Sequence, residues 1–277
     1  MIGKKHLSEL FFGVYHFVRA CFSGMGLLFL PIEIYTNIAN SPSPLDLTGF
    51  IIWGVALGLG VYLIDGEFIT GFARKQISWR VPSTNTTIEI IFGDLFEEEN
   101  PIAIGVNDRF DYVVDDKIIA KSSLHGQAIL KHWPEPSEWK EAIDKELLRK
   151  AGRIDSYQPI GRCVNLERNG KHFLFFVVSE TDEKTNVTSS NSEKVVVAVK
   201  GMLDVARIVG AGRPLSIPLV GAGLARVGLH SDGILHIILA ALTEACKSSH
   251  VTSKIRIVLR PGTEHEINLL QIMRTWS

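Results

Sequence analysis

The 277-residue sequence predicts an α/β domain, built on a mixed, mainly parallel sheet flanked by helices, that follows two transmembrane helices. Two observations predict this class. Apolar residues are concentrated in about the first 70 positions, although the mean hydropathy of the whole chain is only +0.17. From about Thr86 onward, short β-branched runs alternate with helical patterns, which is typical of a parallel sheet covered on both faces. We therefore divide the chain into a membrane region, residues 1–80, and a cytosolic domain, residues 81–277.

The overall charge argues against nucleic acid as a partner, and the cysteine spacing does not indicate a metal site. The formal net charge is −1 and the sequence pI is about 6.8, so no general electrostatic field favours nucleic acid. Cys21, Cys163 and Cys246 are far apart and show neither metal-ligand spacing nor a disulfide framework. They are expected to be buried free thiols in a reducing compartment.

Two apolar stretches, residues 10–30 and 47–64, have about the length that crosses a bilayer. The first is too long for the apolar part of a cleaved signal peptide, and a second stretch follows it at once. The second has no polar face, so as part of a soluble protein it would have to be buried all round. Positively charged residues flank the two spans and are missing from their connector, which predicts that both termini face the cytoplasm. These residues are Lys4, Lys5, Arg74, Lys75 and Arg80.

Arg19 lies well inside the first span, where a charge is costly. Two interpretations remain open. Arg19 reaches back to the cytoplasmic headgroups, or it joins His16 in a polar seam between helices of an oligomer. Small residues at Gly54–Gly58 and Ala20–Gly24 are spaced for close helix packing.

In the cytosolic domain, apolar runs predict five buried strands and longer periodic stretches predict four helices. The strands are Ile88–Phe92, Ile102–Val106, His172–Val178, Leu215–Val220 and Ile255–Leu259. The helices are Ser137–Lys150, Glu193–Val209, His230–Lys247 and Glu264–Thr275.

Polar and glycine-rich turns follow three of these strands, at the edge where such sheets bind ligands. Gly93-Asp94-Leu95 follows the first strand, and the second runs into Asn107-Asp108-Arg109-Phe110-Asp111. A later strand ends in Gly221-Ala222-Gly223, where glycine lets backbone N–H groups approach a phosphate. Each turn alone is a weak signal.

The order of these turns resembles a macro domain. The resemblance implies that Asp94 binds adenine, that Asn107 lies beside the distal ribose, and that the loop Gly221–Leu224 wraps the diphosphate. The ligand-binding positions that we predict are Asp94, Leu95, Asn107, Asp108, Arg109, Phe110, Asp111, Ser123, His125, Pro218, Val220, Gly221, Ala222, Gly223, Leu224 and Arg226. No catalytic residue, metal or cofactor is predicted.

Nearly the whole chain is similar to the macro-domain effectors of Thoeris anti-phage systems, most specifically in the segments VNDRFD and SSLHGQ. That resemblance implies a partner TIR-domain enzyme that makes an ADP-ribose-based signal, such as histidine-ADP-ribose. It also implies that the bound signal drives self-association of the membrane part, disruption of the membrane and abortive infection.

One departure affects the predicted activity. Macro domains that remove ADP-ribose typically continue the Val-Asn with small residues and a second asparagine, whereas Asp108, Arg109 and Phe110 are bulkier and more charged. Binding without hydrolysis is therefore expected. Arg109 and Asp111 recognise the group on the distal ribose, or Arg109 only forms a surface salt bridge with Asp108 or Asp111. His125 either contacts ligand or caps a helix. The alternatives are a membrane-tethered ADP-ribosyl hydrolase and a scaffold for ADP-ribosylated proteins.

Overall fold

A computed structural model describes residues 2–71, 73–99, 101–133, 135–152, 154–185, 187–210, 212–221 and 228–277, without the side chains of residues 2–12, 150 and 151. The chain divides into two compact units. The first comprises Met1–Lys75 with Gly262–Arg274, and the second comprises Gln76–Pro261 with Thr275–Ser277. A C-terminal segment therefore belongs with the N-terminal helices.

The first unit is built on a helical hairpin of α1 (Ile2–Ala39) and α2 (Leu47–Ile64), which continues into a π-helical turn, η1 (Asp65–Ile69). By length and composition, Gly13–Ala39 and Leu47–Ile69 can each cross a membrane. The first helix does not end near Leu30 as predicted but continues through Pro31 to Ala39. One proline removes a single hydrogen bond, and the helix ends only before Asn40, which has a left-handed φ of 47°.

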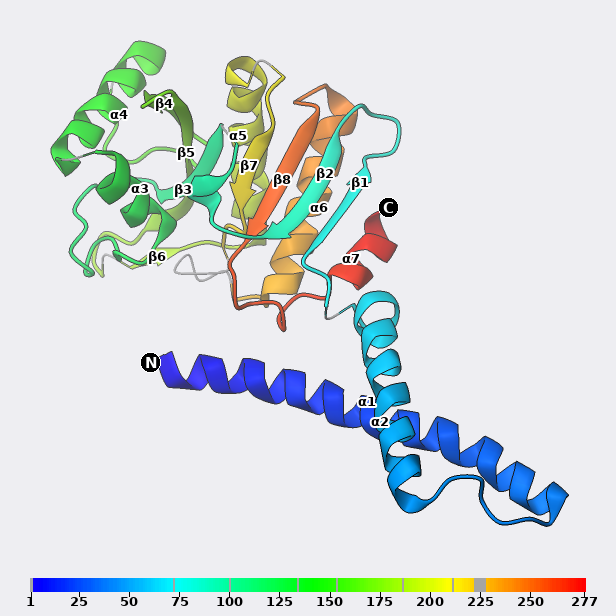
Figure 1. Cartoon of the computed structure of the whole chain (residues 1–277). Coiled ribbons are helices and arrows are strands. Elements are labelled where there is room, and N and C mark those ends of the chain that lie inside the picture. The colour runs from blue at the N-terminus through cyan, green and yellow to red at the C-terminus, as the bar shows by residue number, and fades with distance from the viewer. Residues whose placement is uncertain are drawn as a thin grey trace. The chain divides into compact units, whose positions relative to one another are not determined.

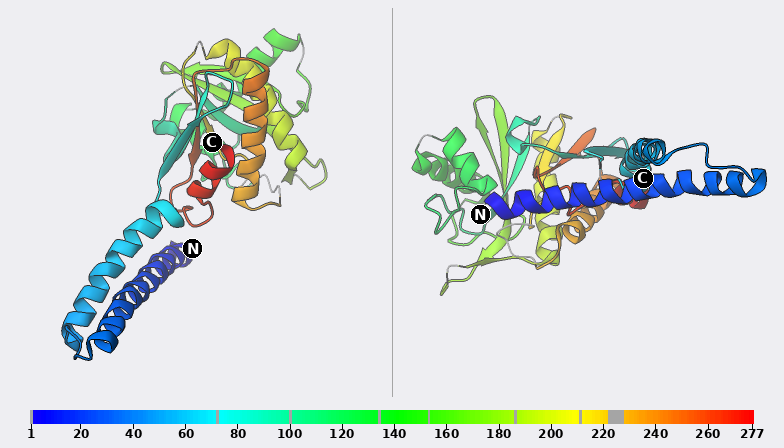
Figure 2. Two further views of the ribbon diagram at one scale, coloured as in Figure 1. Left: turned by 90° about the vertical axis from the view of Figure 1, so that its right-hand side faces the viewer. Right: turned by 60° about the horizontal axis from the view of Figure 1, so that its bottom comes forward.

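The two helices of the hairpin pack backbone against backbone (Figure 2). A Cβ atom added to Gly24 would lie 2.2 Å from the Gly58 nitrogen and 2.5 Å from the Gly54 oxygen. One added to Gly58 would lie 2.7 Å from the Cys21 Cα atom. The small residues that the sequence singled out therefore pack against one another within one chain.

The second unit contains an eight-stranded sheet, most of it in the order β1-β2-β8-β7-β3-β5-β4, with β6 paired to β5 (Figure 1). Strands β2, β8, β7, β3 and β5 are parallel, while β1 and β4 are antiparallel edge strands. The strand bounds are β1 Gln76–Arg80, β2 Thr87–Phe92, β3 Ile102–Asn107, β4 Cys163–Arg168, β5 Lys171–Thr181, β6 Thr188–Ser189, β7 Leu215–Pro218 and β8 Lys254–Leu259. The mixed, mainly parallel sheet that the sequence predicted is confirmed.

Helices cover both faces of this sheet. Helices α3 (Leu124–His132) and α4 (Pro136–Ala151) pack on β3 and β4, and their apolar side chains share one buried cluster with Phe173 and Phe175 of β5. Helix α5 (Ser192–Val209) packs on β5 and against α6 (Ser231–Ser248). Because side chains alternate along a strand, β5 is buried on both faces, as its near-continuous apolar sequence requires.

Most of the predicted elements are present with bounds that differ by only a few residues. Among the four helices predicted after residue 81, the largest difference is at α7 (Leu269–Trp276), which begins five residues after the predicted start at Glu264. Strands β1, β4 and β6 were not predicted, and a helix near Ser123 and His125 was expected without the bounds of α3. Strand β1 alternates exposed and buried positions over only five residues, too short a pattern to stand out beside the apolar hairpin.

Candidate functional site

The three predicted ligand turns lie at the same edge of the sheet. Asp94 follows β2, Gly221 follows β7 and Asn107 ends β3, and these strands are parallel. Two strands, β8 and β7, lie between β2 and β3, so the ends of β2 and β3 are about 14 Å apart. The edge therefore presents Asp94, Gly221 and Asn107 in that spatial order, and such carboxyl edges are where open α/β sheets bind ligands.

Asp94 shapes the first of these turns. Its Oδ1 atom accepts a hydrogen bond from the Phe96 N–H at 2.9 Å and caps the short 3-10 helix η2 (Leu95–Glu97). Its Oδ2 atom lies 3.7 Å from the Lys131 Nζ atom on α3, and that ammonium group lies 4.5 Å from the centre of the Phe96 ring. Leu95 and Phe96 are buried, so they anchor a turn whose carboxylate remains partly exposed.

Asn107 and Asp111 are hydrogen-bonded to each other across the second turn. The Asn107 Nδ2 atom donates to the Asp111 Oδ2 atom at 2.5 Å, and the Asp111 N–H donates to the Asn107 Oδ1 atom at 3.1 Å. Phe110 lies between them in a left-handed conformation, with φ of 49°, and its fully buried ring packs near Trp139. The buried ring holds a tight loop that keeps the amide and the carboxylate together.

Asp108 points into the protein rather than toward the edge. It is 4% exposed, and its Oδ1 atom accepts hydrogen bonds from the Thr181 N–H at 3.1 Å and the Thr181 Oγ1 atom at 2.7 Å. Its backbone also bonds to Ser179 and Gln158. Asp108 thus fastens the loop to the end of β5, and the predicted contact of its carboxylate with ligand has no support in this geometry.

Arg109 takes a partner outside the loop. Its Nη2 atom donates to the Tyr157 hydroxyl at 3.0 Å, and its guanidinium lies 5.1 Å from the centre of the Tyr157 ring. A cation stacked on an exposed aromatic ring offers both a charge and a flat apolar face to a ligand.

Ser123 and His125 begin α3, and the structure separates their roles. The Ser123 Oγ atom accepts from the Gly126 N–H at 3.0 Å and donates to the Ala120 carbonyl at 2.7 Å, so Ser123 is the N-cap. His125 is buried beside Trp139, with ring centres 5.1 Å apart, and burial lowers the pKa of His125 to about 3. His125 is therefore not the cap, and it is neutral at physiological pH.

The third turn is only partly described. Pro218 ends β7, Val220 donates its N–H to the Pro218 carbonyl at 2.9 Å, and Gly221 has a left-handed φ of 89° that favours glycine. Ala222, Gly223, Leu224 and Arg226 lie outside the described residues.

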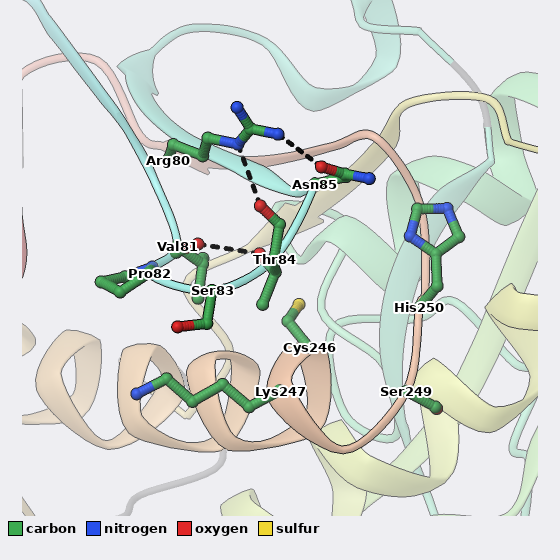
Figure 3. A pocket seen from close by; sticks show the side chains of 10 residues that line it. All are labelled: Arg80, Val81, Pro82, Ser83, Thr84, Asn85, Cys246, Lys247, Ser249 and His250. Carbon is green, nitrogen blue, oxygen red and sulfur yellow. Dashed lines mark hydrogen bonds between the residues drawn. The ribbon is translucent and has the colours of Figure 1, made fainter.

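A hollow of about 680 Å³ lies at the other end of the sheet, around the β1–β2 turn and the C-terminal end of α6 (Figure 3). Arg80, Lys247 and His250 line it, together with buried Cys246. It contains none of the predicted ligand residues. Among the described residues, no group of three or more His, Cys, Asp or Glu side chains is arranged to hold a metal ion.

Three side chains at the edge were missed by the sequence analysis: Lys131, Tyr157 and Thr181. Lys131 and Thr181 are brought to the site by α3 and β5, and Tyr157 lies in an irregular loop. Their partners are far away in sequence, so no local pattern marks them.

Comparison with known proteins adds to this geometry. Residues 88–260 match the family described as Thoeris protein ThsA, Macro domain. The Thoeris protein ThsA of Bacillus amyloliquefaciens (strain Y2) is 24% identical over 257 residues, which cover 87% of this chain and 85% of that protein. Among solved structures, the Oceanobacillus iheyensis macrodomain with MES bound has a TM-score of 0.52 at 13% identity, covering 72% of this chain and 96% of that chain. The same macrodomain with ADP has a TM-score of 0.51 at 13% identity and covers 72% and 97%.

Proposed function

The chain belongs to the macro-domain family of Thoeris protein ThsA, and on that premise we propose that it is a membrane-anchored anti-phage effector gated by an ADP-ribose derivative. In this proposal a partner TIR-domain enzyme makes the signal, and the macro domain binds it. The bound state then drives assembly of the membrane hairpins, disruption of the membrane and abortive infection. A ligand shifts such an equilibrium only by the difference in its affinity for the two states.

The observation that carries the proposal is the alignment of three turns along one sheet edge. Asp94, Gly221 and Asn107 follow parallel strands in an order that suits an extended ligand, with adenine at Asp94, diphosphate at the glycine turn and the distal ribose at Asn107. The distance of about 14 Å between the outer two turns requires a long ligand rather than a simple phosphate. The Oceanobacillus iheyensis macrodomain, which shares this fold, has been solved with ADP.

The amino-acid part of the signal is assigned to the far end of this edge. Asp111, next to Asn107, supplies a carboxylate for a cationic group, and Arg109 with Tyr157 supplies a guanidinium over an aromatic ring. A conjugate such as histidine-ADP-ribose carries an ammonium group, a carboxylate and an imidazole, which these three side chains complement.

We propose binding without hydrolysis. The Asn107 amide is already bonded to Asp111, and Asp108 is held by Thr181, so neither group is poised to activate water. Incubation of the protein with an ADP-ribosylated protein substrate tests this point. Release of free ADP-ribose would instead identify a tethered hydrolase.

Assembly of the hairpins requires a face that the hairpin itself does not use. Because Gly24, Gly54 and Gly58 pack within one chain, we assign assembly to the outward apolar faces, which include Phe22, 71% exposed, and Ile52, 61% exposed. Both termini and the macro domain are proposed to face the cytoplasm.

The direct test is calorimetric titration of the full-length protein, in detergent, with ADP-ribose, cyclic ADP-ribose and histidine-ADP-ribose. We expect Asp94→Ala to weaken the best ligand about tenfold, since one hydrogen bond to a charged group is lost. Glu97→Ala is the matched control, because Glu97 is an exposed acid on the same turn. Absence of binding by all three nucleotides would refute the proposal.

A further inference from the structure

The turn that follows the second helix of the hairpin has an uncommon geometry. Residues Asp65–Ile69 form a π-helix, in which the Asp65 carbonyl accepts from the Thr70 N–H at 2.8 Å. The same carbonyl also accepts from the Gly71 N–H at 3.4 Å and the Thr70 Oγ1 atom at 3.0 Å. Isolated π-helical turns are rare and are frequently found at functional sites, where a helix must change its hydrogen-bond register.

The Asp65 side chain ties this π-turn to the first helix. Its carboxylate is buried, accepts a hydrogen bond from the Arg19 guanidinium and lies 3.7 Å from the His16 Nδ1 atom. The partner of the membrane arginine is thus a carboxylate of the same chain. Arg19 and Asp65 stabilise each other's charge only while α1 and the π-turn keep their present register.

Helix α7 contacts the same turn through a hydrogen bond and through close packing. The Arg274 Nη2 atom donates to the Phe68 carbonyl at 3.0 Å. Leu270 packs so closely on Gly71 that a Cβ atom added to the glycine would lie 2.4 Å from the Leu270 Cβ atom. Arg74 joins the two segments, because its Nε atom donates to the Glu67 carbonyl at 2.8 Å and its Nη1 atom lies 3.9 Å from the Met273 sulfur.

The chain that leads into α7 comes directly from the candidate ligand edge. Strand β8 ends at Leu259, whose carbonyl accepts a hydrogen bond from the Gly93 N–H at 3.0 Å, next to Asp94. A short connection then leads to α7, which begins at Leu269. Strand β8 is thus linked to the Gly93–Asp94 turn by a hydrogen bond and to α7 by the continuity of the chain.

We propose that the π-turn Asp65–Ile69 couples α7 to α1, so that it transmits ligand binding from the macro domain to the membrane hairpin. A shift of α7 alters the hydrogen bond to Phe68 and the packing on Gly71. The register of the turn then changes, and with it the pairing of Asp65 with Arg19. The transmission of ligand binding rests on the proposed function, whereas the coupling through the turn does not depend on ligand.

The coupling is tested by a double-mutant cycle on the full-length protein in detergent. Arg19→Leu and Arg274→Ala each remove one contact of the π-turn, and the readout is the hydrogen-exchange rate of the amides of residues 65–71. We expect each variant to accelerate exchange, and the double variant to differ from the product of the two accelerations by about twofold or more. A control cycle of Arg19→Leu with Arg213→Ala, which removes an exposed arginine of the second unit, should be multiplicative.

Addition of histidine-ADP-ribose then separates the coupling through the turn from the transmission of ligand binding. We expect the nucleotide to change exchange at residues 65–71 in the wild type, and Arg274→Ala to abolish that change with an unaltered Kd. A multiplicative Arg19–Arg274 cycle overturns the coupling through the turn. Nucleotide binding that leaves exchange at residues 65–71 unchanged overturns the transmission of ligand binding. Failure of the wild type to bind any nucleotide refutes the proposed function, and the cycle still decides whether the turn couples the two helices.

Discussion

The first unit, which contains the hairpin (the hairpin unit), and the second unit, which contains the sheet (the macro unit), each bury an aspartate. The carboxylates of these two aspartates have different kinds of partner. Asp65 of the hairpin is 7% exposed and is paired with the Arg19 guanidinium, with His16 close by. Asp108 of the macro unit is 4% exposed, and its Oδ1 atom accepts two hydrogen bonds from Thr181, an uncharged residue. One carboxylate is matched with a charge and the other with neutral donors.

The surroundings of the two units account for this difference. In the membrane that we propose for the hairpin, an unpaired charge is costly, so a buried carboxylate needs a cation. At the strand ends of the second unit, a backbone N–H group and a hydroxyl are sufficient to hold a carboxylate in place. The contrast therefore predicts different responses to the same kind of substitution in the two units.

The largest expected effect comes from the glycine contact that sets the spacing of the hairpin. Gly24→Leu would drive a side chain into the backbone of Gly54 and Gly58, so α1 and α2 must separate, at a cost of about 3 kcal/mol in the free energy of unfolding. Unfolding of the full-length protein by SDS measures it. Gly26→Leu is the matched control, since a Cβ atom at Gly26 meets nothing within 4 Å. Equal effects of the two substitutions would contradict the packing of the hairpin.

Removal of one charge from the hairpin should come next. Asp65→Leu leaves Arg19 without its carboxylate, and we expect a loss of about 2 kcal/mol, less than for a fully buried pair because the Arg19 side chain is 44% exposed. The double substitution Arg19→Leu with Asp65→Leu should recover at least half of the loss, because no unpaired charge remains. The same SDS unfolding assay serves, and a double variant that is less stable than Asp65→Leu would argue against charge matching.

The macro unit should respond differently at Asp108. Asp108→Asn keeps an oxygen acceptor for Thr181 and is expected to cost about 1 kcal/mol or less, whereas Asp108→Ala leaves two donors unsatisfied and costs about 2 kcal/mol. Urea unfolding followed by tryptophan fluorescence measures both values. If Asp108→Asn proved as damaging as Asp108→Ala, the negative charge itself would be required, and the contrast with Asp65 would disappear.

The sequence predicted best those elements whose own residues decide their structure. The bounds of α2 agree with the predicted 47–64 because a stretch without any polar face leaves one interpretation, and Asp46 caps it at the start. Strand β5 was found for the same reason, as a run of apolar residues buried on both faces. Strand β4 was missed because its sequence, CVNLER, is short and partly polar.

Contacts between residues that are distant in sequence account for most of the features that could not be predicted from the sequence. The spacing of Gly54 and Gly58 predicted close packing but could not tell whether the partner helix belongs to the same chain. Arg19 was ambiguous because Asp65 lies 46 positions away. At the candidate site, the turns at Asp94 and Asn107 were identifiable from their strands, whereas the partners Lys131 and Thr181 arrive through tertiary packing.

The contrast between the units extends to histidine, where the expected effect appears only on acidification. His16 and His125 are both 8% exposed, but His16 lies near Asp65 while His125 packs against Trp139 and Phe175. Burial lowers the pKa of His125 from 6.5 to about 3, so below pH 6.5 the unfolded chain takes up a proton that the folded protein does not. Its stabilising contribution is complete above pH 6.5 and is lost as the pH falls from 6.5 toward 3.

Between pH 7 and pH 5 this uptake should cost about 2 kcal/mol of stability, and His125→Phe should remove that part of the pH dependence because phenylalanine does not titrate. Urea unfolding at both pH values measures the difference, and the exposed His250 provides the control substitution His250→Phe. The aromatic cluster around His125 offers its ring no acid to pair with, so protonation of the buried ring is unfavourable in the folded protein. An unchanged pH dependence in His125→Phe would mean that the protonated His125 ring finds a solvated position in the folded protein.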